Sequence, residues 1–404
     1  MQTLRNRSRW AVPLLLLILV ALIGGCSEKR HANRIVFAAA LLPSEQSEYT
    51  DILRSFTRKT GIQVELVAQQ YDQIRMSLEA EAQARRGQLD LVELDVYMLP
   101  LLQKRMRPLD SLLTFSDSLR IRVPKDAWQA GVLGSPAHLS FVPHRLNWEA
   151  LIYNARLLGS PPRTWDALLR VAKAHPGAVG LKAARYEGLV CDLFPFVWQA
   201  GGDVLHPNTP QVLAAVQFLR KLAPYLNPFV RSYKENNILQ AQEQEEIVLH
   251  PNWPFAVPLL RQKGLLPETM RTAPLPSGPA GPATVLGGGY LGVPRTAPHP
   301  QRAAKLLRFL TGRFAQRAFV RRLGWFPIRE DAWSAMTQKD QRDFSGFLAM
   351  RRYVRARPSL LSYPEISRIW QDGFYRMIFG KQDPGRILPQ MQRQIDALVT
   401  KGKP

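Results

Sequence analysis

The chain has 404 residues, of which 46% are hydrophobic and 21% are charged. This composition excludes a disordered chain, and the length predicts about two or three domains of roughly 150 residues each. The formal net charge of +22 favours an anionic partner, which could be nucleic acid, a membrane surface or an acidic ligand. The basic residues stand in short groups such as Arg351-Arg352, without a nucleic-acid-binding motif around them. We therefore expect no nucleic acid and favour anionic lipid headgroups, with a functionless arginine-rich composition as the open alternative.

The first 25 residues are predicted to be an export signal. Three arginines precede an apolar stretch, which is followed by two small residues and a cysteine (Arg5, Arg7, Arg9; Ala11–Ile23; Gly24, Gly25; Cys26). The apolar stretch is shorter than the roughly 20 residues of a transmembrane helix, so an uncleaved anchor is the less favoured alternative. Residues 23–26 resemble a lipobox, which implies cleavage before Cys26 and a lipid on that cysteine. The resemblance implies a lipidated linker over residues 26–33 and a protein anchored outside the cytoplasm.

The next hundred residues alternate between strand and helix patterns. An apolar run over residues 35–41 predicts a buried strand, and the spacing of Tyr49, Ile52, Leu53 and Phe56 predicts a helix capped by Ser47. Gly61 is expected to end this helix. A strand over 62–67, a helix over 74–86 and a strand over 89–94 follow, an order typical of a parallel α/β sheet.

A similar pattern restarts in the middle of the chain. Residues 150–153 predict a strand, and Thr164 is expected to cap a helix that begins at Trp165. Helices are predicted over 211–223 and 301–322, with a Pro/Gly-rich surface loop over 273–282. Two α/β lobes are the simplest interpretation.

Short motifs along the chain resemble, in their order, one family. They are FTRKTGIQVELV (56–67), DLVELD (90–95), PLD (108–110), LIYN (151–154), PPRTWDAL (161–168), GG (201–202), NWPF (252–255), GGGYLGV (287–293) and FPIR (326–329). This order is similar to that of the extracellular solute-binding proteins of ABC importers, family 1, the sugar-binding group with maltose/trehalose-type receptors. The similarity runs from about Arg34 to Trp333 and more weakly to the end of the chain.

The resemblance implies a two-lobed, periplasmic-binding-protein-like fold of type II. Each lobe would be a mixed sheet flanked by helices, with the ligand in the cleft between the lobes. We expect lobe 1 to contain residues 34–142 and 290–328, and lobe 2 to contain residues 143–289 and 329–404. The chain would cross between the lobes near 142–145, 286–290 and 325–329. The family further implies a monomeric, non-enzymatic receptor without a cofactor, which presents its ligand to a membrane permease.

Sugar binding requires carboxylates or amides for the hydroxyls and flat aromatic rings for the C–H faces. By resemblance, Asp95 at the end of the third strand faces the cleft, and Glu93 lies on the same strand face. Glu45, in the loop after the first strand, holds another position that commonly contacts ligand in the family. The open alternatives are that Asp95 caps a local turn and that Glu45 caps the helix beside Ser47.

Further candidate contacts come from the later motifs. Trp253 matches the cleft tryptophan of the family, with core packing as its alternative. Tyr290 follows glycines, among them Gly288 and Gly289, that would let the backbone approach a ligand. The remaining candidates are a polar pair before the strand at 150–153, an arginine at the third crossing and one tyrosine (His144, Asn147; Arg329; Tyr71). The alternative for Arg329 is that it is an ordinary surface residue. Trp148 and Trp198 are weaker candidates, and we expect them to pack in the core.

The sequence gives little support for a dinucleotide site or a metal site. Residues 287–292 satisfy G-x-G-x-x-G, but the prolines that follow prevent a helix from starting there, so a dinucleotide site is not expected. The histidines do not cluster at metal spacing, and we expect no metal. The sequence thus predicts a lipid-anchored receptor that delivers a carbohydrate to an ABC permease. An envelope glycoside hydrolase and the ligand-binding subunit of a sensory system stay open as alternatives.

Overall fold

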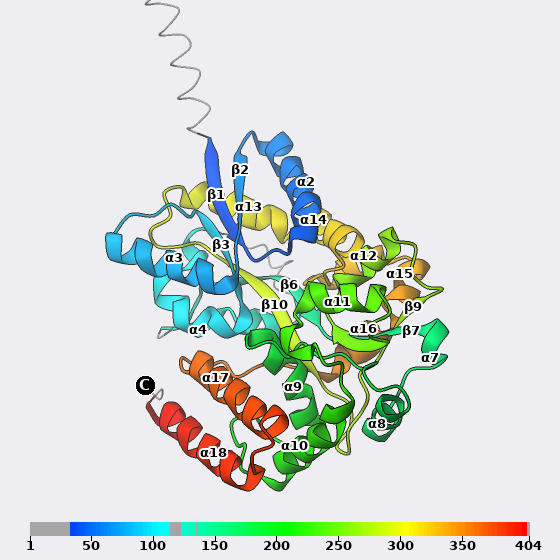
Figure 1. Cartoon of the computed structure of the whole chain (residues 1–404). Coiled ribbons are helices and arrows are strands. Elements are labelled where there is room, and N and C mark those ends of the chain that lie inside the picture. The colour runs from blue at the N-terminus through cyan, green and yellow to red at the C-terminus, as the bar shows by residue number, and fades with distance from the viewer. Residues whose placement is uncertain (1–32, 114–122, 135, 402–404) are drawn as a thin grey trace, which may run out of the picture.

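The computed structural model describes residues 33–113, 123–134 and 136–401 (Figure 1). The predicted export signal, Cys26 and most of the predicted linker lie outside the described residues. Among the helices that are described, none combines the length and the apolar character needed to cross a bilayer.

Three parallel strands begin the first sheet, in the order the sequence predicts. They are β1 (Arg34–Ala39), β2 (Gln63–Ala68) and β3 (Leu91–Asp95), and β1 pairs with both of the others. The helices α2 (Pro43–Thr60) and α3 (Tyr71–Ala84) connect them. Figure 1 shows these elements together with α13 (Pro300–Leu310) and α14 (Arg313–Ala318) in the upper half of the molecule.

The ends of α2 test two sequence-based expectations. The prediction that Ser47 caps the helix is wrong, because α2 begins four residues earlier, at Pro43. There the carboxylate of Glu45 accepts the backbone N–H of Leu42 at 2.9 Å. Glu45 therefore does cap the start of this helix, which was the alternative to ligand contact. The prediction for Gly61 is confirmed. This glycine has a φ of 71° and donates its N–H to the carbonyl of Thr57.

A long strand from late in the chain completes the first sheet. β10 (Thr284–Gly292) runs antiparallel to β3 and to β6 (Val142–Trp148), and it also pairs with the short strand β11 (Val354–Arg355). In register, Gly289 lies opposite Asp95 and Leu286 lies opposite Trp148. The sheet is therefore mixed, as the family resemblance implies, and differs from the purely parallel sheet that the first hundred residues suggest by themselves.

The second sheet has three antiparallel strands. Its centre is β7 (Ala150–Asn154), flanked by β8 (Leu249–Asn252) and β9 (Met270–Ala273). The prediction that Thr164 caps a helix is confirmed, since its side chain accepts the N–H of Ala167 at the start of α8 (Trp165–Ala174). α9 (Glu187–Gln199) and α10 (Pro210–Leu222) follow. The predicted loop over 273–282 joins β9 to β10.

The predicted helix over 301–322 is divided into three pieces. α13 ends at Leu310, α14 covers Arg313–Ala318, and a π-helical turn covers Phe319–Leu323. The described chain also contains shorter helices and strands: α4 (Leu99–Leu102), α6 (Lys125–Gln129), β4 (Val132–Leu133), β5 (His138–Leu139), α7 (Ala155–Leu158), α11 (Glu235–Glu243) and α12 (Ala256–Gln262).

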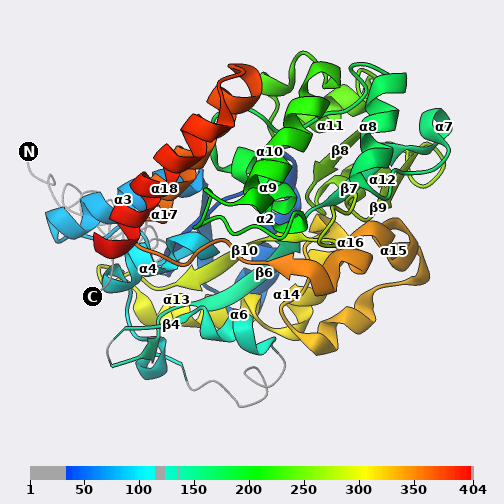
Figure 2. The same ribbon diagram turned by 90° about the horizontal axis from the view of Figure 1, so that it is seen from below.

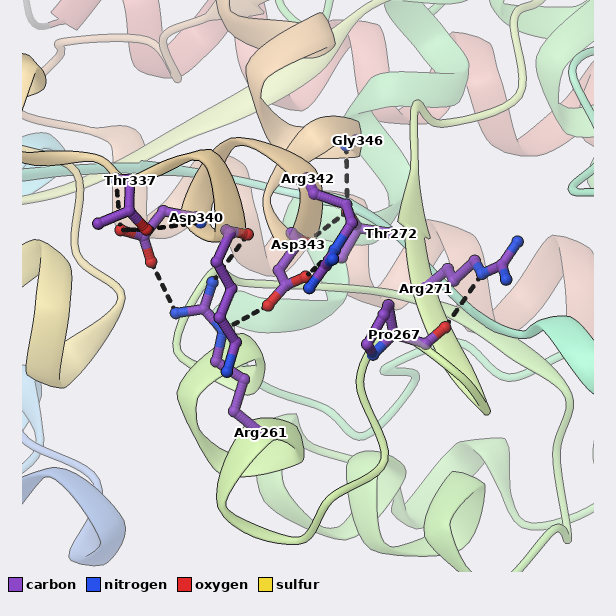
Figure 3. A network of polar contacts seen from close by, with 10 residues as sticks. Arg261, Pro267, Arg271, Thr272, Thr337, Asp340, Arg342, Asp343 and Gly346 are labelled. Carbon is purple, nitrogen blue, oxygen red and sulfur yellow. Dashed lines mark hydrogen bonds and ion pairs between the residues drawn. The ribbon is translucent and has the colours of Figure 1, made fainter.

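The helices of the last seventy residues pack on the second sheet and its helices, while β11 pairs with β10 of the first sheet. α16 (Ser345–Met350) contacts β7 and β9, while α17 (Tyr363–Phe374) contacts α9 and α18 (Pro384–Lys401). Figure 2, seen from below, shows α17 and α18 side by side. In Figure 3, Arg261 of α12 forms ion pairs with Asp340 at 2.7 Å and with Asp343 at 2.6 Å, which fixes α15 (Gln338–Asp343). The residue-by-residue division into lobes stays a prediction.

Candidate ligand-binding site

A cavity of about 210 Å³ lies where the two sheets and their helices meet. At roughly 30 Å³ per molecule, this space would hold about seven waters. Its lining comes from segments far apart in the chain: Ala40, Leu41, Leu42, Glu45, Gln70, Tyr71, Asp95, Arg145, Asn147, Tyr186, Glu187, Gly188, Cys191, Glu235, Trp253, Phe255, Gly287, Gly288 and Arg357. The first sheet and its loops supply one wall, and α9, α11 and the segment after β8 supply the other.

Arg357 joins carboxylates from both walls. Its Nη2 lies 2.5 Å from Oδ1 of Asp95, and its Nη1 lies 2.7 Å from Oε1 of Glu187, the first residue of α9. Glu187 also accepts hydroxyl hydrogens from Tyr363 at 2.6 Å and Ser367 at 2.7 Å. Burial raises the pKa of Glu187 by more than Arg357 and these hydroxyls lower it. Asp95 also accepts the N–H of Tyr97, so the local turn contact considered for it exists beside the ion pair.

A second buried guanidinium supports the wall formed by the first sheet. Arg145 of β6 donates from Nε to Glu93 at 2.7 Å, and from Nη2 to the carbonyl of Ala40 at 2.7 Å. Its Nη2 also lies 3.3 Å from the hydroxyl of Tyr71. Burial opposes ionisation of Glu93, but Arg145 and His144 outweigh it and lower the pKa of this carboxyl. Arg145 therefore fixes the loop after β1 and the ring of Tyr71 at the cavity.

Glu45 reaches the same wall from the start of α2. Its Oε1 accepts the indole N–H of Trp325 at 2.6 Å and lies 3.8 Å from Nη1 of Arg145. Burial raises the pKa of Glu45, and the charge of Arg145 offsets this only in part. The carboxylate thus has both a capping role and a place on the cavity surface.

Trp253 forms part of the opposite wall and is only partly buried. Its ring lies against Gly287, where a Cβ would come within 2.7 Å of the indole Cζ3. The ammonium of Lys182 lies 5.9 Å from the ring centroid. Gly287 is therefore required for the position of this ring, and the ring presents an apolar face near the cavity.

The lining carries more acidic than basic side chains. Four carboxylates are present (Glu45, Asp95, Glu187, Glu235), against the two guanidiniums of Arg145 and Arg357. Both guanidiniums already pair with carboxylates. The cavity of this strongly basic protein is therefore acidic, and the excess positive charge lies elsewhere on the molecule.

The structure brings most of the predicted contact residues to this cavity. Glu45, Tyr71, Asp95, Asn147, Trp253 and Gly288 line it. Trp148 and Trp198 are buried, and Trp148 stacks on Phe326 at 4.4 Å between ring centroids, as expected for core residues.

Four predicted residues do not line the cavity. Tyr290 is fully buried and its hydroxyl donates to the carbonyl of Ala127 at 3.0 Å. His144 is fully buried between Tyr49 and Glu93. Gly289 leaves room for Glu93, since a Cβ would lie 1.7 Å from its Oε1, and Arg329 forms an ion pair with Asp331 at 2.9 Å. These four residues therefore lie outside the proposed site.

Sequence reasoning missed both arginines at the cavity. Arg145 stands in β6, a strand that is buried along almost its whole length, and a charge in a buried strand is a usable signal. Arg357 stands in an arginine-rich segment that resembles a solvated surface, and its partners Asp95 and Glu187 are distant in sequence. Tyr186 and Glu187 were likewise not singled out.

The comparisons with known proteins agree with this architecture. Residues 51–342 match the model of the family described as bacterial extracellular solute-binding protein. The chain is 24% identical over 407 residues to a probable ABC transporter-binding protein of Deinococcus radiodurans, covering 93% of this chain and 96% of the relative.

Solved structures with two lobes are similar over nearly the whole chain. A Thermotoga lettingae ABC transporter solute-binding protein bound with alpha-D-tagatose has a TM-score of 0.81 at 22% identity, covering 91% of this chain and 100% of that one. Maltose-bound MalE3 of T. maritima has a TM-score of 0.79 at 24% identity, covering 90% and 99%. These similarities confirm the predicted two-lobed α/β fold. With the family match spanning more than half of its length, the chain belongs to the bacterial extracellular solute-binding proteins.

Proposed function

We propose that this protein is the solute receptor of an ABC importer, which binds a carbohydrate between its lobes and delivers it unchanged to the permease. The observation that carries the proposal is the cavity itself, which is lined by Trp253 and Tyr71 together with carboxylates from both walls. Aromatic faces cover the C–H surface of a sugar, and carboxylates accept its hydroxyl hydrogens. The relatives, which include a probable ABC transporter-binding protein and solute-binding proteins with maltose or tagatose bound, support the same class.

The charge of the lining supports an uncharged sugar. The carboxylates outnumber the guanidiniums, and both guanidiniums are engaged by Asp95, Glu187 and Glu93. An anionic sugar would face net repulsion at short range in a poorly hydrated site. The volume of about 210 Å³ lies below the roughly 300–1,000 Å³ of a drug-sized pocket, which favours a small saccharide over a long oligosaccharide.

The membrane attachment is part of the proposal. The lipobox-like residues 23–26 support a lipid on Cys26, and the extracellular character of the family supports a site outside the cytoplasm. The receptor would act as a monomer, held beside its permease by the lipid. A Cys26→Ser exchange should release the protein from the membrane fraction, whereas continued retention after this exchange would contradict the anchor.

The test of the proposed ligand is a thermal shift with residues 27–404, which include both complete sheets and all the helices around them. We expect a neutral mono- or disaccharide to raise the melting temperature, because it binds only the folded state. Uronic acids and sugar phosphates should have no effect.

Two variants of one residue make this test specific. Trp253→Ala should weaken binding by about 5- to 30-fold, since about 1–2 kcal/mol of stacking and burial is lost, while Trp253→Phe should retain part of the affinity. A ligand recovered in cleaved form would instead indicate a hydrolase. A response to acidic sugars alone would contradict the assignment of ligand class.

A further inference from the structure

A second and larger hollow lies on the outside of the first lobe. Its volume is about 780 Å³, and it runs between α2 on one side and α14 with the following π-helical turn on the other. Six of the residues that line it are arginines: Arg54, Arg58, Arg313, Arg317, Arg321 and Arg322. We call this hollow the arginine groove. Figure 1 shows α2 and α14 side by side at the upper edge of the molecule, away from α17 and α18.

The arginines form two facing rows. Arg54 and Arg58 are four residues apart on α2, and Arg313, Arg317 and Arg321 repeat at the same interval on the other side. Side chains four residues apart share one face of a helix, and like charges at this spacing destabilise it. The stability of the helices therefore does not explain why arginines occur at this spacing.

Most of this charge has no partner in the described part of the chain. Arg54 pairs with Asp51 at 2.6 Å, and Arg322 lies 3.4 Å from Glu48. No carboxylate among the described residues pairs with Arg58, Arg313, Arg317 or Arg321, and the buried Nε of Arg317 has no hydrogen-bond acceptor there. The groove therefore presents a concentrated and largely uncompensated positive charge.

We propose that the arginine groove binds the phosphate groups of anionic lipids at the membrane surface. A guanidinium holds a phosphate through two parallel hydrogen bonds, and facing rows of arginines provide several such sites over an extended surface. Phe314 lies within the groove with 52% of its surface exposed. An aromatic side chain among basic residues is typical of proteins that lie on the boundary between headgroups and acyl chains.

The position of the groove in the chain also favours a membrane. β1 begins eight residues after Cys26, and an extended linker of this length spans about 28 Å at roughly 3.5 Å per residue. α2 follows β1 directly, so a lipid on Cys26 would hold the arginine groove close to the bilayer. This step rests on the proposed anchor, whereas the charge and the shape of the groove do not.

The experiment measures binding to vesicles without the lipid anchor. Residues 27–404 are sedimented with vesicles of phosphatidylcholine alone or with one third phosphatidylglycerol. We expect binding only to the anionic vesicles, and we expect it to fall as salt screens the charges. Each arginine near an anionic surface contributes about a fivefold factor in partitioning, so Arg313→Ala/Arg321→Ala should weaken binding about 25-fold.

The matched control removes the same charge from the opposite end of the molecule. Arg386→Ala/Arg393→Ala alters two exposed arginines of α18, which Figure 1 places at the lower edge, and should change vesicle binding less than about threefold. Equal losses in the two double variants would reduce the effect to net charge and overturn the proposal. Absence of vesicle binding would also overturn it.

Two further readouts separate the possible outcomes. A groove that binds soluble polyglutamate but no anionic vesicle would recognise an acidic protein, which would also overturn the lipid assignment. The sugar-induced thermal shift should be unchanged in both double variants, because neither pair lines the ligand cavity. If vesicle binding follows the prediction while no sugar binds, the proposed function is wrong, but the proposal that the arginine groove binds lipid is supported.

Discussion

Arg357 Nη2 lies 2.5 Å from Asp95 Oδ1, so the segment after α16 is joined to the carboxyl end of β3. The same guanidinium pairs with Glu187 at the start of α9. One buried side chain therefore connects carboxylates that belong to opposite walls of the cavity. Because charged groups out of water depend on their partners, this arrangement makes Arg357 important for the folded state as well as for the site.

Replacing Arg357 by methionine should lower the free energy of unfolding by about 3 kcal/mol, because Asp95 and Glu187 lose the cation between them. Urea unfolding followed by tryptophan fluorescence measures the change. Arg355→Met is the matched control, since Arg355 is exposed and lies two residues away, and it should change stability by less than about 0.5 kcal/mol. Equal unfolding midpoints for Arg357→Met and the unaltered chain would contradict the importance of the ion pairs.

Gly289→Ala should destabilise the protein by about 3 kcal/mol. A Cβ at this position would lie 1.7 Å from Oε1 of Glu93, whose carboxylate is held by Arg145, so the buried ion pair would have to move. Gly385→Ala near the start of α18 is the control, because its Cβ would meet only a flexible carboxylate at 3.3 Å. Guanidinium unfolding would settle the comparison, and a Gly289 variant as stable as the Gly385 variant would refute this geometry.

A buried triad beneath Trp253 predicts a dependence of stability on pH. The ammonium of Lys182 lies 2.7 Å from Glu149 and 2.5 Å from Asp192, with all three side chains buried. Burial raises the pKa of Glu149 to about 8, and the nearby charge of Asp192 adds to this, although Lys182 opposes it. The folded protein therefore keeps a proton at the triad that the unfolded chain releases above about pH 4.5.

A raised carboxyl pKa stabilises the folded state fully below the unfolded pKa and loses this contribution as the pH rises toward the folded value. We expect the free energy of unfolding to decrease between about pH 5 and pH 8, by up to about 1.4 kcal/mol per pH unit for one proton. Glu149→Gln should flatten this part of the profile, whereas Glu245→Gln, at an exposed position, should leave it unchanged. Urea titrations at each pH provide the profile, and an equally steep decrease in Glu149→Gln would exclude the triad as its cause.

Arg261→Ala should lower the free energy of unfolding by about 2–4 kcal/mol at pH 7, because the buried Asp343 and its neighbour Asp340 lose their cation (Figure 3). Burial opposes ionisation of Asp340, but the N–H of Thr337 and the guanidinium of Arg261 outweigh it and lower the pKa of this carboxyl. Its contribution is therefore present above about pH 4 and is lost as the pH falls through the folded pKa.

The difference between Arg261→Ala and the unaltered chain should consequently shrink at pH 3. Arg271→Ala is the neighbouring control, since Arg271 Nε donates only to the carbonyl of Pro267 in Figure 3. Thermal unfolding at pH 3 and pH 7 tests both statements. A constant difference across this range would show that Arg261 acts through packing instead of charge.

Local patterns predicted the elements that local interactions specify. The apolar spacing that includes Phe56 gave α2, and Gly61 and Thr164 gave correct helix ends, because caps and amphipathic faces are encoded within a few residues. The pairing of β10 with β3 and β6 has no local signal, since it joins segments that are distant in the chain. For the same reason the sequence suggested a parallel sheet where the sheet is mixed.

The site shows the same limit. Asp95, Glu45 and Trp253 line the cavity. The sequence indicated these residues through the end of a strand and the order of the family motifs, which show the segments that meet there. Tyr290 does not line the cavity, because its ring is buried and its hydroxyl donates to the carbonyl of Ala127. Of the glycines before it, Gly288 lines the cavity, whereas Gly289 makes room for Glu93. Whether a glycine makes room for a ligand or for a side chain depends on contacts that the sequence does not show.

The position of β10 in the first sheet also determines when, during synthesis, this sheet can be completed. β3 is complete at Asp95, but its antiparallel neighbour ends at Gly292, about 200 residues later, and a ribosome adds about 5–20 residues each second. For tens of seconds of synthesis β3 therefore lacks the strand that pairs with its edge in the folded protein. A chain that is to be threaded through a membrane before it folds gains from this delay, because its first lobe stays incomplete until most of the chain has been made.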